Sequence, residues 1–181
     1  KAKQLLDEAG YKEKKGVRKK GRTTLKFTFV LDKELAEQQA LFLGIQAQLK
    51  KVGITVKAKY RNHAAYKEEV YRKKKFDLTM NVWSFREVED IYPLFHTKGS
   101  QNFIGYSNGD VDQLLENAAA TKDYKQLKSF NKQLHARLNK ELPYFFLWSL
   151  DIYSGISRRV GNVYIAPYYY FTSFKEWELT P

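Results

Sequence analysis

The sequence contains no cysteine. That absence excludes structural disulfides, thiol catalysis and zinc sites held by cysteine. The three histidines, His63, His96 and His135, lack the spacing that places two imidazoles on one helical face. The sequence also has no phosphate-binding glycine loop and no nucleophile elbow. We therefore expect neither metal nor thiol chemistry.

Long apolar stretches are also missing. No run approaches the roughly 20 residues that span a bilayer, and the N-terminus lacks the pattern of a signal peptide. The only methionine is Met80, and the chain opens at Lys1 in an amphipathic pattern. Of the 181 residues 43% are hydrophobic, which is enough to fill a core. We expect a folded piece of a longer protein.

Positive charge is abundant but unevenly placed. The net charge is +12, and residues 11–26 hold eight Lys or Arg and one Glu, which is +7 of that total. Two glycines and few apolar residues accompany this run, which favours a solvated tongue over a surface that reads nucleic acid. A second run, Arg72–Lys75, ends a helical pattern, where cations suit the helix dipole.

Hydrophobic periodicity switches between two and 3.6 residues, which predicts an α/β fold. We expect a first helix that ends at Gly10, a helix capped by Asp32 and a short helix capped by Asn62. Further along, Asn108-Gly109-Asp110 is predicted to open a helix, and Thr121-Lys122-Asp123 to cap the next one. The predicted strands of one sheet lie near residues 24–31, 54–60 and 76–83; the predicted helices are 33–52 and a pair within 110–141. The aromatic stretches 144–153 and 163–174 are predicted to be extended.

A loop of about 20 residues, Ser84–Gly105, follows the third predicted strand, and loops of that length are usually functional. Its acids Glu87, Glu89 and Asp90 could supply an acid and a base, but no nucleophile or orienting partner is visible near them. Solvated loop charge is the simpler interpretation of these acids. A catalytic lobe that uses them is the least favoured of the three functional hypotheses considered for this chain.

Six motifs, taken in order, resemble one family. They are KQLLDEAGY (Lys3–Tyr11), IQAQLKKVGI (Ile45–Ile54), KFDL (Lys75–Leu78) leading to Trp83, NFIGYSN (Asn102–Asn108), DVDQLL (Asp110–Leu115) and ELPYFFL (Glu141–Leu147). Over about residues 1–160 the chain resembles the carboxy-terminal lobe of the family 5 extracytoplasmic solute-binding proteins, the peptide, oligopeptide and nickel class that feeds ABC transporters.

The resemblance implies an α/β fold with a mixed sheet flanked by helices, as one lobe of a two-lobed clamp. Residues 1–162 would form the ligand-binding lobe, and 163–181 would return to a missing amino-terminal lobe. It implies capture of a small peptide or other small solute, no enzymatic activity and no cofactor. The implied partners are that lobe and the membrane permease, with no nucleic acid. The implied location is the periplasm or cell surface, with a lipid anchor in the full-length protein.

The resemblance also implies a binding site. In peptide-binding relatives the ligand backbone pairs with the strand end that matches Asn81-Val82-Trp83 here, a mode in which a peptide adds to a sheet edge. Ser84, Arg86, Asn102 and Phe103 are expected on the same side. The alternative, that Trp83 is simply a core aromatic that ends a strand, stays open.

One position departs from the family pattern. Relatives that take a free peptide amino terminus carry an Asp three residues past this Trp, where the chain has Arg86. The ammonium partner could instead be Glu87, Glu89 or Asp90. Peptide is the family's commonest ligand, and a blocked peptide, a sugar or a ligand with a carboxylate facing Arg86 is also allowed.

A hypothesis from another class is a basic domain that binds nucleic acid or an anionic surface through the Lys/Arg run at residues 12–26. Such binding should weaken steeply with salt, whereas ligand capture by a clamp should be nearly insensitive to it.

Overall fold

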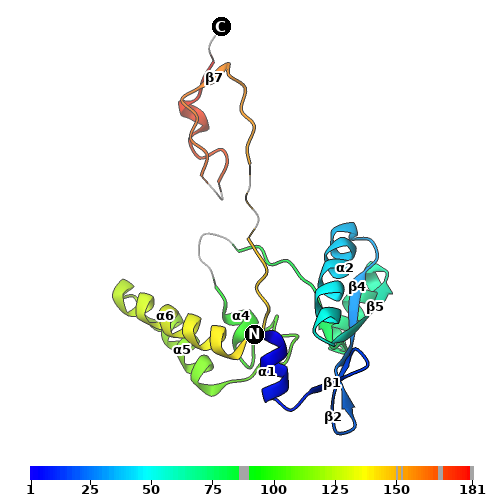
Figure 1. Cartoon of the computed structure of the whole chain (residues 1–181). Coiled ribbons are helices and arrows are strands. Elements are labelled where there is room, and N and C mark those ends of the chain that lie inside the picture. Colours follow the sequence, from blue (N-terminus) through cyan, green and yellow to red (C-terminus); the bar gives the residue numbers. More distant parts are fainter. Residues whose placement is uncertain (86–89, 150, 152, 167–168, 180–181) are drawn as a thin grey trace. The chain divides into compact units, whose positions relative to one another are not determined.

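The computed structural model describes residues 1–85, 90–149, 151, 153–166 and 169–179. The chain divides into two compact units, which Figure 1 shows in the colours of the sequence. The first comprises Lys1–Trp83 with Pro93–Ser107, and the second comprises Ser84–Tyr92 with Asn108–Pro181. The boundary predicted at residue 162 stays a prediction.

The first unit is built on a three-stranded parallel sheet. Its strands are β4 (Lys26–Asp32), β5 (Thr55–Arg61) and β6 (Leu78–Thr79), in the order β5-β4-β6. These strands confirm the predicted α/β architecture. The third is much shorter than residues 76–83, and among the described residues antiparallel pairing occurs only in the small sheets β1-β2-β3 and β7-β8.

Both faces of this sheet are covered, as expected for parallel strands. On one face α2 (Ala36–Lys51) brings Phe42 against Phe29, their rings 5.5 Å apart and nearly perpendicular. On the other face Val30 contacts a cluster from α3 (His63–Lys67), from the π-helix η1 (Glu68–Arg72) and from the loop at Phe103. The β4–α2–β5 unit is therefore the framework of the sheet (Figure 1).

Two predicted caps had different outcomes. Asn62 caps α3 as predicted, because its side-chain Oδ1 accepts a hydrogen bond from the Ala65 amide at 2.8 Å. The prediction that Asp32 caps the next helix is wrong: α2 begins after Leu35, with no side-chain cap. Asp32 instead ends β4, and one of its carboxylate oxygens is bonded to His63.

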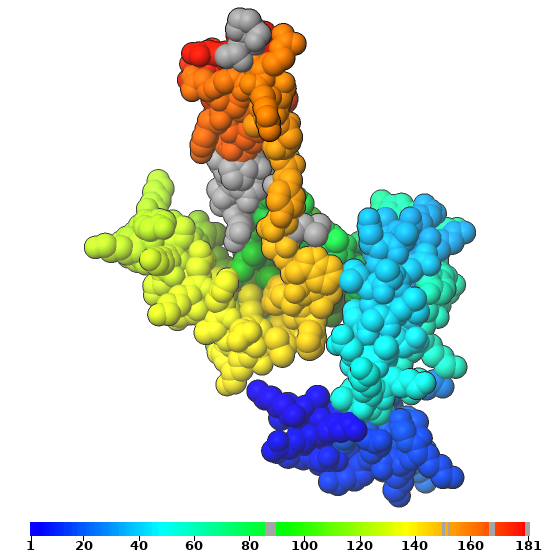
Figure 2. All heavy atoms as spheres, turned by 45° about the horizontal axis from the view of Figure 1, so that its top comes forward, coloured from blue at the N-terminus to red at the C-terminus, as the bar shows by residue number. Residues whose placement is uncertain are grey.

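The basic segment at residues 11–26 is more ordered than the predicted tongue. It follows α1 (Ala2–Glu8) and forms a sheet of β1 (Lys12–Lys14), β2 (Val17–Lys20) and β3 (Thr23–Thr24). Arg18 is only 2% exposed and donates to Asp7 Oδ1 at 2.8 Å and to the Val52 carbonyl at 2.9 Å. One cation of the run therefore anchors the sheet, while the others remain on the blue surface in Figure 2.

The second unit contains a helical hairpin and an aromatic C-terminal segment. Helices α5 (Gly109–Ala120) and α6 (Tyr124–Glu141) are capped by Asn108 and Asp123, as predicted. Their buried contacts come from Val111, Leu115, Leu134 and Leu138. That this pair flanks the sheet stays a prediction.

The aromatic stretches are less regular than predicted. The described residues of the first stretch, 144–149, 151 and 153, lie outside any strand. Further along, β7 (Val160–Gly161) pairs with β8 (Glu178–Leu179), and the 3-10 helix η2 (Phe174–Glu176) begins at the last residue of the second stretch.

The predicted long loop also contains a short helix, α4 (Tyr92–Phe95). Among the described residues, no helix has the length and apolar character needed to cross a membrane.

Candidate functional site

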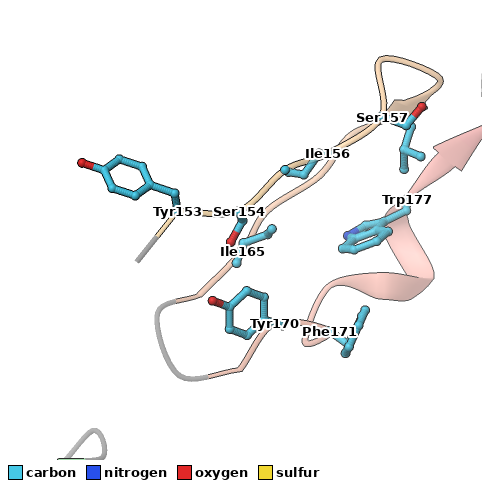
Figure 3. A pocket seen from close by; sticks show the side chains of 10 residues that line it. Tyr153, Ser154, Ile156, Ser157, Ile165, Tyr170, Phe171 and Trp177 are labelled. Atoms are coloured by element: carbon cyan, nitrogen blue, oxygen red, sulfur yellow. The ribbon is translucent and has the colours of Figure 1, made fainter. Parts of the chain in front are cut away.

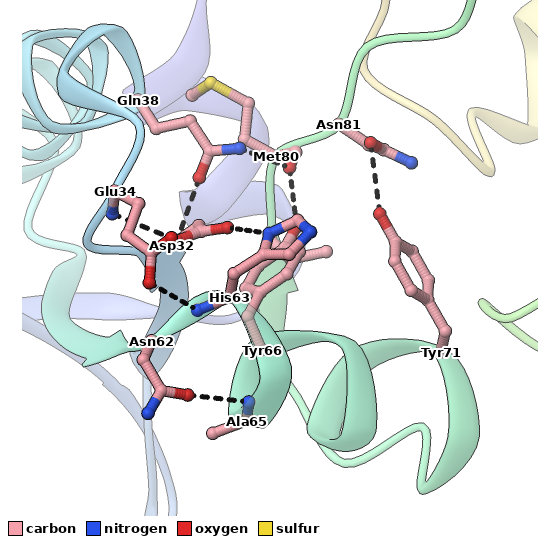
Figure 4. A network of polar contacts seen from close by, with 11 residues as sticks. Asp32, Glu34, Gln38, Asn62, His63, Ala65, Tyr66, Tyr71, Met80 and Asn81 are labelled. Carbon is pink, nitrogen blue, oxygen red and sulfur yellow. Dashed lines mark hydrogen bonds and ion pairs between the residues drawn. The ribbon is translucent and has the colours of Figure 1, made fainter.

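The end of the edge strand β6 is fixed by hydrogen bonds from the helices around it (Figure 4). The Met80 carbonyl accepts from the Tyr66 hydroxyl at 2.8 Å and from Gln38 Nε2 at 3.3 Å. Tyr66 also bonds to the Thr79 hydroxyl, which donates to the Val30 carbonyl at 3.0 Å. Burial raises the pKa of the Tyr66 phenol to about 12, so it remains a donor at neutral pH.

Asp32 extends this network to the neighbouring strand end. The residue is fully buried, its Oδ2 lies 2.6 Å from His63 Nδ1, and its Oδ1 accepts from the Glu34 amide. Burial alone would raise the pKa of Asp32, but the hydrogen bonds with His63 and the Glu34 amide outweigh it and hold the pKa below its ordinary value. The backbone that leaves β6 is therefore held in one position.

A hollow of about 360 Å³ opens where the chain leaves β6. Aromatic rings form much of its wall: Trp83 stacks on Phe103 with ring centres 5.7 Å apart, and Tyr71 meets Phe103 edge-on at 4.9 Å. Its lining residues are Tyr71, Lys74, Asn81, Val82, Trp83, Ser100, Gln101 and Phe103. This combination of apolar rings and a few polar groups is typical of a small-molecule site.

Within the described part of the chain, two polar side chains at this site differ in their hydrogen bonding: Asn81 is bonded, and Trp83 is not. Asn81 Oδ1 accepts from the Tyr71 hydroxyl at 3.3 Å and from the Val82 amide at 3.0 Å. The indole Nε1 of Trp83 is buried and has no hydrogen-bond partner among the described residues. An unpaired buried donor costs about 1–3 kcal/mol, so an acceptor brought by a ligand could recover part of that energy.

The structure brings together four of the predicted site residues, Asn81, Val82, Trp83 and Phe103. Phe103 is buried, whereas the Val82 side chain is 76% exposed beside the hollow. Both interpretations of Trp83 have support, because its ring contacts the core and also lines the hollow. The assignment of these four residues to ligand binding stays a prediction.

Asn102 lies close to the hollow without lining it. Its side chain is 4% exposed and bonds to the His96 and Tyr106 carbonyls and to the Tyr106 amide. We therefore assign Asn102 a positioning role in the loop that carries Phe103.

The remaining predicted residues lie in or next to the segment after Trp83. Ser84 and Asp90 are exposed members of the second unit, and Asp90 Oδ1 accepts from the Tyr92 amide at 3.0 Å. Arg86, Glu87 and Glu89 lie outside the described residues.

Sequence reasoning missed four lining residues, Tyr71, Lys74, Ser100 and Gln101. The Arg72–Lys75 run was interpreted only through the helix dipole, although Lys74 actually adopts a left-handed backbone conformation with φ of 51°. The long loop was singled out as a functional candidate, and it contains Ser100 and Gln101, so a search along it for residues near Phe103 could have found Gln101.

The C-terminal segment carries a second hollow, of about 380 Å³ (Figure 3). Figure 3 shows Tyr170, Phe171 and Trp177 around it, with Ile156 and Ile165 from the paired stretches. None of the described residues that line it is charged. It is therefore suited to an apolar contact.

Comparison with known proteins gives a consistent set of similarities. A family model described as bacterial extracellular solute-binding proteins, family 5 Middle, matches residues 1–104. The oligopeptide-binding protein AppA of Bacillus subtilis (strain 168) is 31% identical over 154 residues, which is 82% of this chain and 28% of that protein. The chain thus spans less than a third of that curated relative.

Solved structures show the same pattern. The B. subtilis oligopeptide-binding protein AppA in complex with a nonapeptide matches 99% of this chain and 37% of its own, with a TM-score of 0.75 and 26% identity. A mannohexaose-bound periplasmic oligopeptide-binding protein from Thermotoga maritima matches 78% of this chain and 29% of its own, with a TM-score of 0.70 and 28% identity. NikZ from Campylobacter jejuni, in complex with Ni(L-His), shares the fold at 21% identity and a TM-score of 0.70 over 78% of this chain and 30% of its own.

Proposed function

We propose, from the premise that this chain belongs to the family 5 bacterial extracellular solute-binding proteins, that it is the ligand-binding lobe of a peptide-capturing clamp. The clamp would deliver its ligand to the permease of an ABC importer. Its role is binding, not catalysis. It would work outside the cytoplasm, and a lipid anchor in the full-length protein would keep it near the membrane.

The observation that carries this proposal is the open edge of β6. The sheet order β5-β4-β6 leaves β6 with β4 on one side and no strand on the other among the described residues. Beyond it, the amide and carbonyl of Trp83 have no hydrogen-bond partner in the described part of the chain. An extended peptide can add to such an edge through main-chain hydrogen bonds, which gives affinity without regard to side-chain identity.

The aromatic hollow beside this edge would receive one ligand side chain. Trp83, Phe103 and Tyr71 provide a large apolar contact area of low conformational entropy, which suits a central binding contact. The hydrogen bonds to the Met80 carbonyl hold the adjoining backbone in place before the ligand arrives, so little ordering is lost on binding.

We further propose that residues 163–181 return to the amino-terminal lobe of the clamp. The hollow around Phe171 and Trp177 would meet that lobe. Two of its lining rings, Tyr153 and Phe171, are 88% and 71% exposed and would be covered by the contact. Large exposed rings of this kind usually mark an interaction surface.

A sugar is the second candidate ligand. Aromatic rings stack on sugar rings as readily as on apolar side chains, and the Thermotoga relative is described with bound mannohexaose. The nucleic-acid hypothesis has less support, because Arg18, a member of the basic run, is buried in an internal contact.

The test is isothermal titration calorimetry of the full-length protein with a panel of tripeptides to nonapeptides and with mannohexaose. Peptide binding is expected, with little change between low and high salt. Trp83→Ala should weaken the best peptide about 30-fold, which corresponds to about 2 kcal/mol. Trp148→Ala, at an exposed indole in the second unit, is the matched control.

Absence of any peptide binding would refute the proposal. Binding of mannohexaose alone would replace the peptide with a sugar. Unchanged peptide affinity in a folded Trp83→Ala protein would remove this residue from the site.

A further inference from the structure

Lys74 is the one charged residue that lines the hollow at the end of β6, within the part of the chain that the structure describes. The other lining residues are aromatic, aliphatic, amide or hydroxyl side chains. A single ammonium group beside aromatic rings gives the hollow a defined electrostatic preference, because no other described residue in its wall carries charge.

The Lys74 ammonium is held at this position from two directions. Its backbone has a φ of 51°, a left-handed conformation that non-glycine residues adopt only where the surroundings impose it. Its Nζ donates to the Asn102 carbonyl at 3.0 Å. Asn102 is itself fixed, because its buried side chain makes three hydrogen bonds to the loop backbone.

The hydrogen bond to Asn102 uses one of three donors. An ammonium group carries three N–H donors and no acceptor, so two remain for another partner. Lys74 has no carboxylate partner among the described residues.

Neighbouring cations differ in this respect. Lys73 lies 3.5 Å from Glu68, while Lys59 and Arg61 both pair with Glu69. Those carboxylates are therefore already engaged elsewhere, and Lys74 is the lysine of this surface whose charge is directed to the hollow without a counter-ion.

We propose that this hollow is a subsite for a ligand carboxylate and that Lys74 is the residue that selects it. This inference rests on the proposed function and adds the chemical class of the ligand group. The carboxylate would accept from Lys74 Nζ at the rim, while the carbon chain that bears it would lie against Trp83 and Phe103. Such a charge-assisted bond is stronger than a neutral one, and the adjacent rings reduce its exposure to water.

Two groups of a peptide offer this chemistry. One is the side chain of Glu or Asp, and the other is the terminal carboxylate. Both carboxylates would use the same donors. Amidation of the peptide removes only the terminal charge, whereas a Glu-to-Gln exchange in the peptide removes only the side-chain charge, so the two can be distinguished.

The test is calorimetric titration of the full-length protein with alanine-based hexapeptides. The panel carries one Glu at each position in turn, the matched Gln peptides, and free or amidated carboxyl ends. For the unmodified protein, one of these exchanges should lower affinity about fivefold to tenfold, and the difference should shrink as salt is raised.

Lys74→Met is the decisive variant, because it keeps an unbranched side chain and removes the charge. It should bind acidic and neutral peptides equally. Lys75→Met, at the next lysine along the chain and outside the lining, should keep the preference and is the matched control.

The inference is overturned if acidic and neutral peptides bind the unmodified protein equally, or if their ratio survives in Lys74→Met. Both of those outcomes leave peptide capture intact. Failure of every peptide to bind would instead refute the proposed function, and the subsite with it.

Discussion

At the scale of single residues, Asp32 shows how a buried charge organises the strand ends. It joins the end of β4 to the start of α3 through His63, while Gln38 Oε1 accepts from its backbone amide at 3.2 Å. The same Gln38 side chain donates to the Met80 carbonyl. Asp32 therefore acts in two ways: its carboxylate ties β4 to α3, and its backbone amide orients the Gln38 side chain that bonds to Met80.

The lowered pKa of Asp32 predicts a pH dependence. A carboxyl group whose pKa is lower in the folded state contributes stability above its unfolded pKa of about 3.9, and this stability is lost as the pH falls through the folded-state pKa. Lys67 acts on Asp32 in the same direction as His63. A second acid, Glu34, also contacts His63: its Oε1 accepts a hydrogen bond from the His63 amide at 3.2 Å.

Urea unfolding between pH 3 and pH 7 measures this effect. The free energy of unfolding should fall below about pH 4, and the fall should be shallower in Asp32→Asn. Asp7 and Glu69 also have lowered pKa values, so the difference between the two proteins isolates Asp32. Parallel pH profiles would show that Asp32 gains nothing from its charged form.

Tyr66→Phe should destabilise the first unit by about 1–2 kcal/mol. The substitution removes the hydroxyl that donates to the Met80 carbonyl and leaves this buried acceptor with only the longer bond from Gln38. Tyr60→Phe, at a tyrosine that is 46% exposed, is the control and should change the free energy of unfolding little. Equal effects in the two variants, measured by urea unfolding, would contradict the proposed importance of this bond.

The candidate site could be predicted from sequence only in part. Asn81, Val82 and Trp83 were predictable because they lie at the end of the predicted strand 76–83 and precede a long loop. Lys74 and Tyr71 were not, because their positions depend on a π-helical turn and a left-handed residue that no hydrophobic period reveals. Asn102 looked like a ligand contact because its three bonds to the loop backbone are invisible in the sequence.

At the scale of elements, the extra residue in the turn of η1 decides which side chains reach the hollow. The Lys73 amide bonds to the Glu68 carbonyl five residues earlier, at 2.9 Å, instead of four. The added residue changes the rotation of the chain relative to an α-helix, so Tyr71 and Lys74 both line the hollow. Single-turn insertions of this type occur often at functional sites.

The turn between α2 and β5 depends on a glycine. Gly53 has a φ of +81°, and a Cβ there would lie 2.7 Å from Cγ of the buried Arg18. Gly53→Ala should therefore destabilise the protein by about 2–3 kcal/mol, because backbone strain adds to the displacement of Arg18. Gly16→Ala isolates the cost of backbone strain, because Gly16 also has a positive φ, +77°, but has open space around it.

Thermal or urea unfolding of the two alanine variants compares these contributions. The larger loss is expected for Gly53→Ala. Equal losses would mean that Arg18 moves aside without cost.

Local signals explain which elements were predictable. The caps at Asn62, Asn108 and Asp123 act within three residues of themselves, and all three were correctly predicted. The cap at Asp32 was wrong because a partner 31 residues away, His63, takes its carboxylate. The order within the basic tongue could not be predicted for the same reason, since Arg18 bonds to Val52 across 34 residues.

At the scale of the whole molecule, the 181-residue chain alone should bind peptide much more weakly than the full-length protein, by on the order of 100-fold. One lobe provides part of the contacts and cannot exclude water, so its polar contacts compete with solvent. Calorimetry at high protein concentration compares the two. Circular dichroism of the isolated chain is the control for folding, and equal affinities would contradict the two-lobed mechanism.

The open edge of β6 has a consequence beyond ligand capture. An unpaired strand edge is a template for any extended chain, including a second copy of the same protein, and is therefore a site of aggregation. Lys73, Lys74 and Lys75 precede this strand and are separated from it by Phe76 and Asp77. Their like charges repel a second copy approaching edge to edge, and strong salt would screen that repulsion. Lys73, Lys74 and Lys75 would therefore oppose self-association at this edge and leave it available to a short ligand.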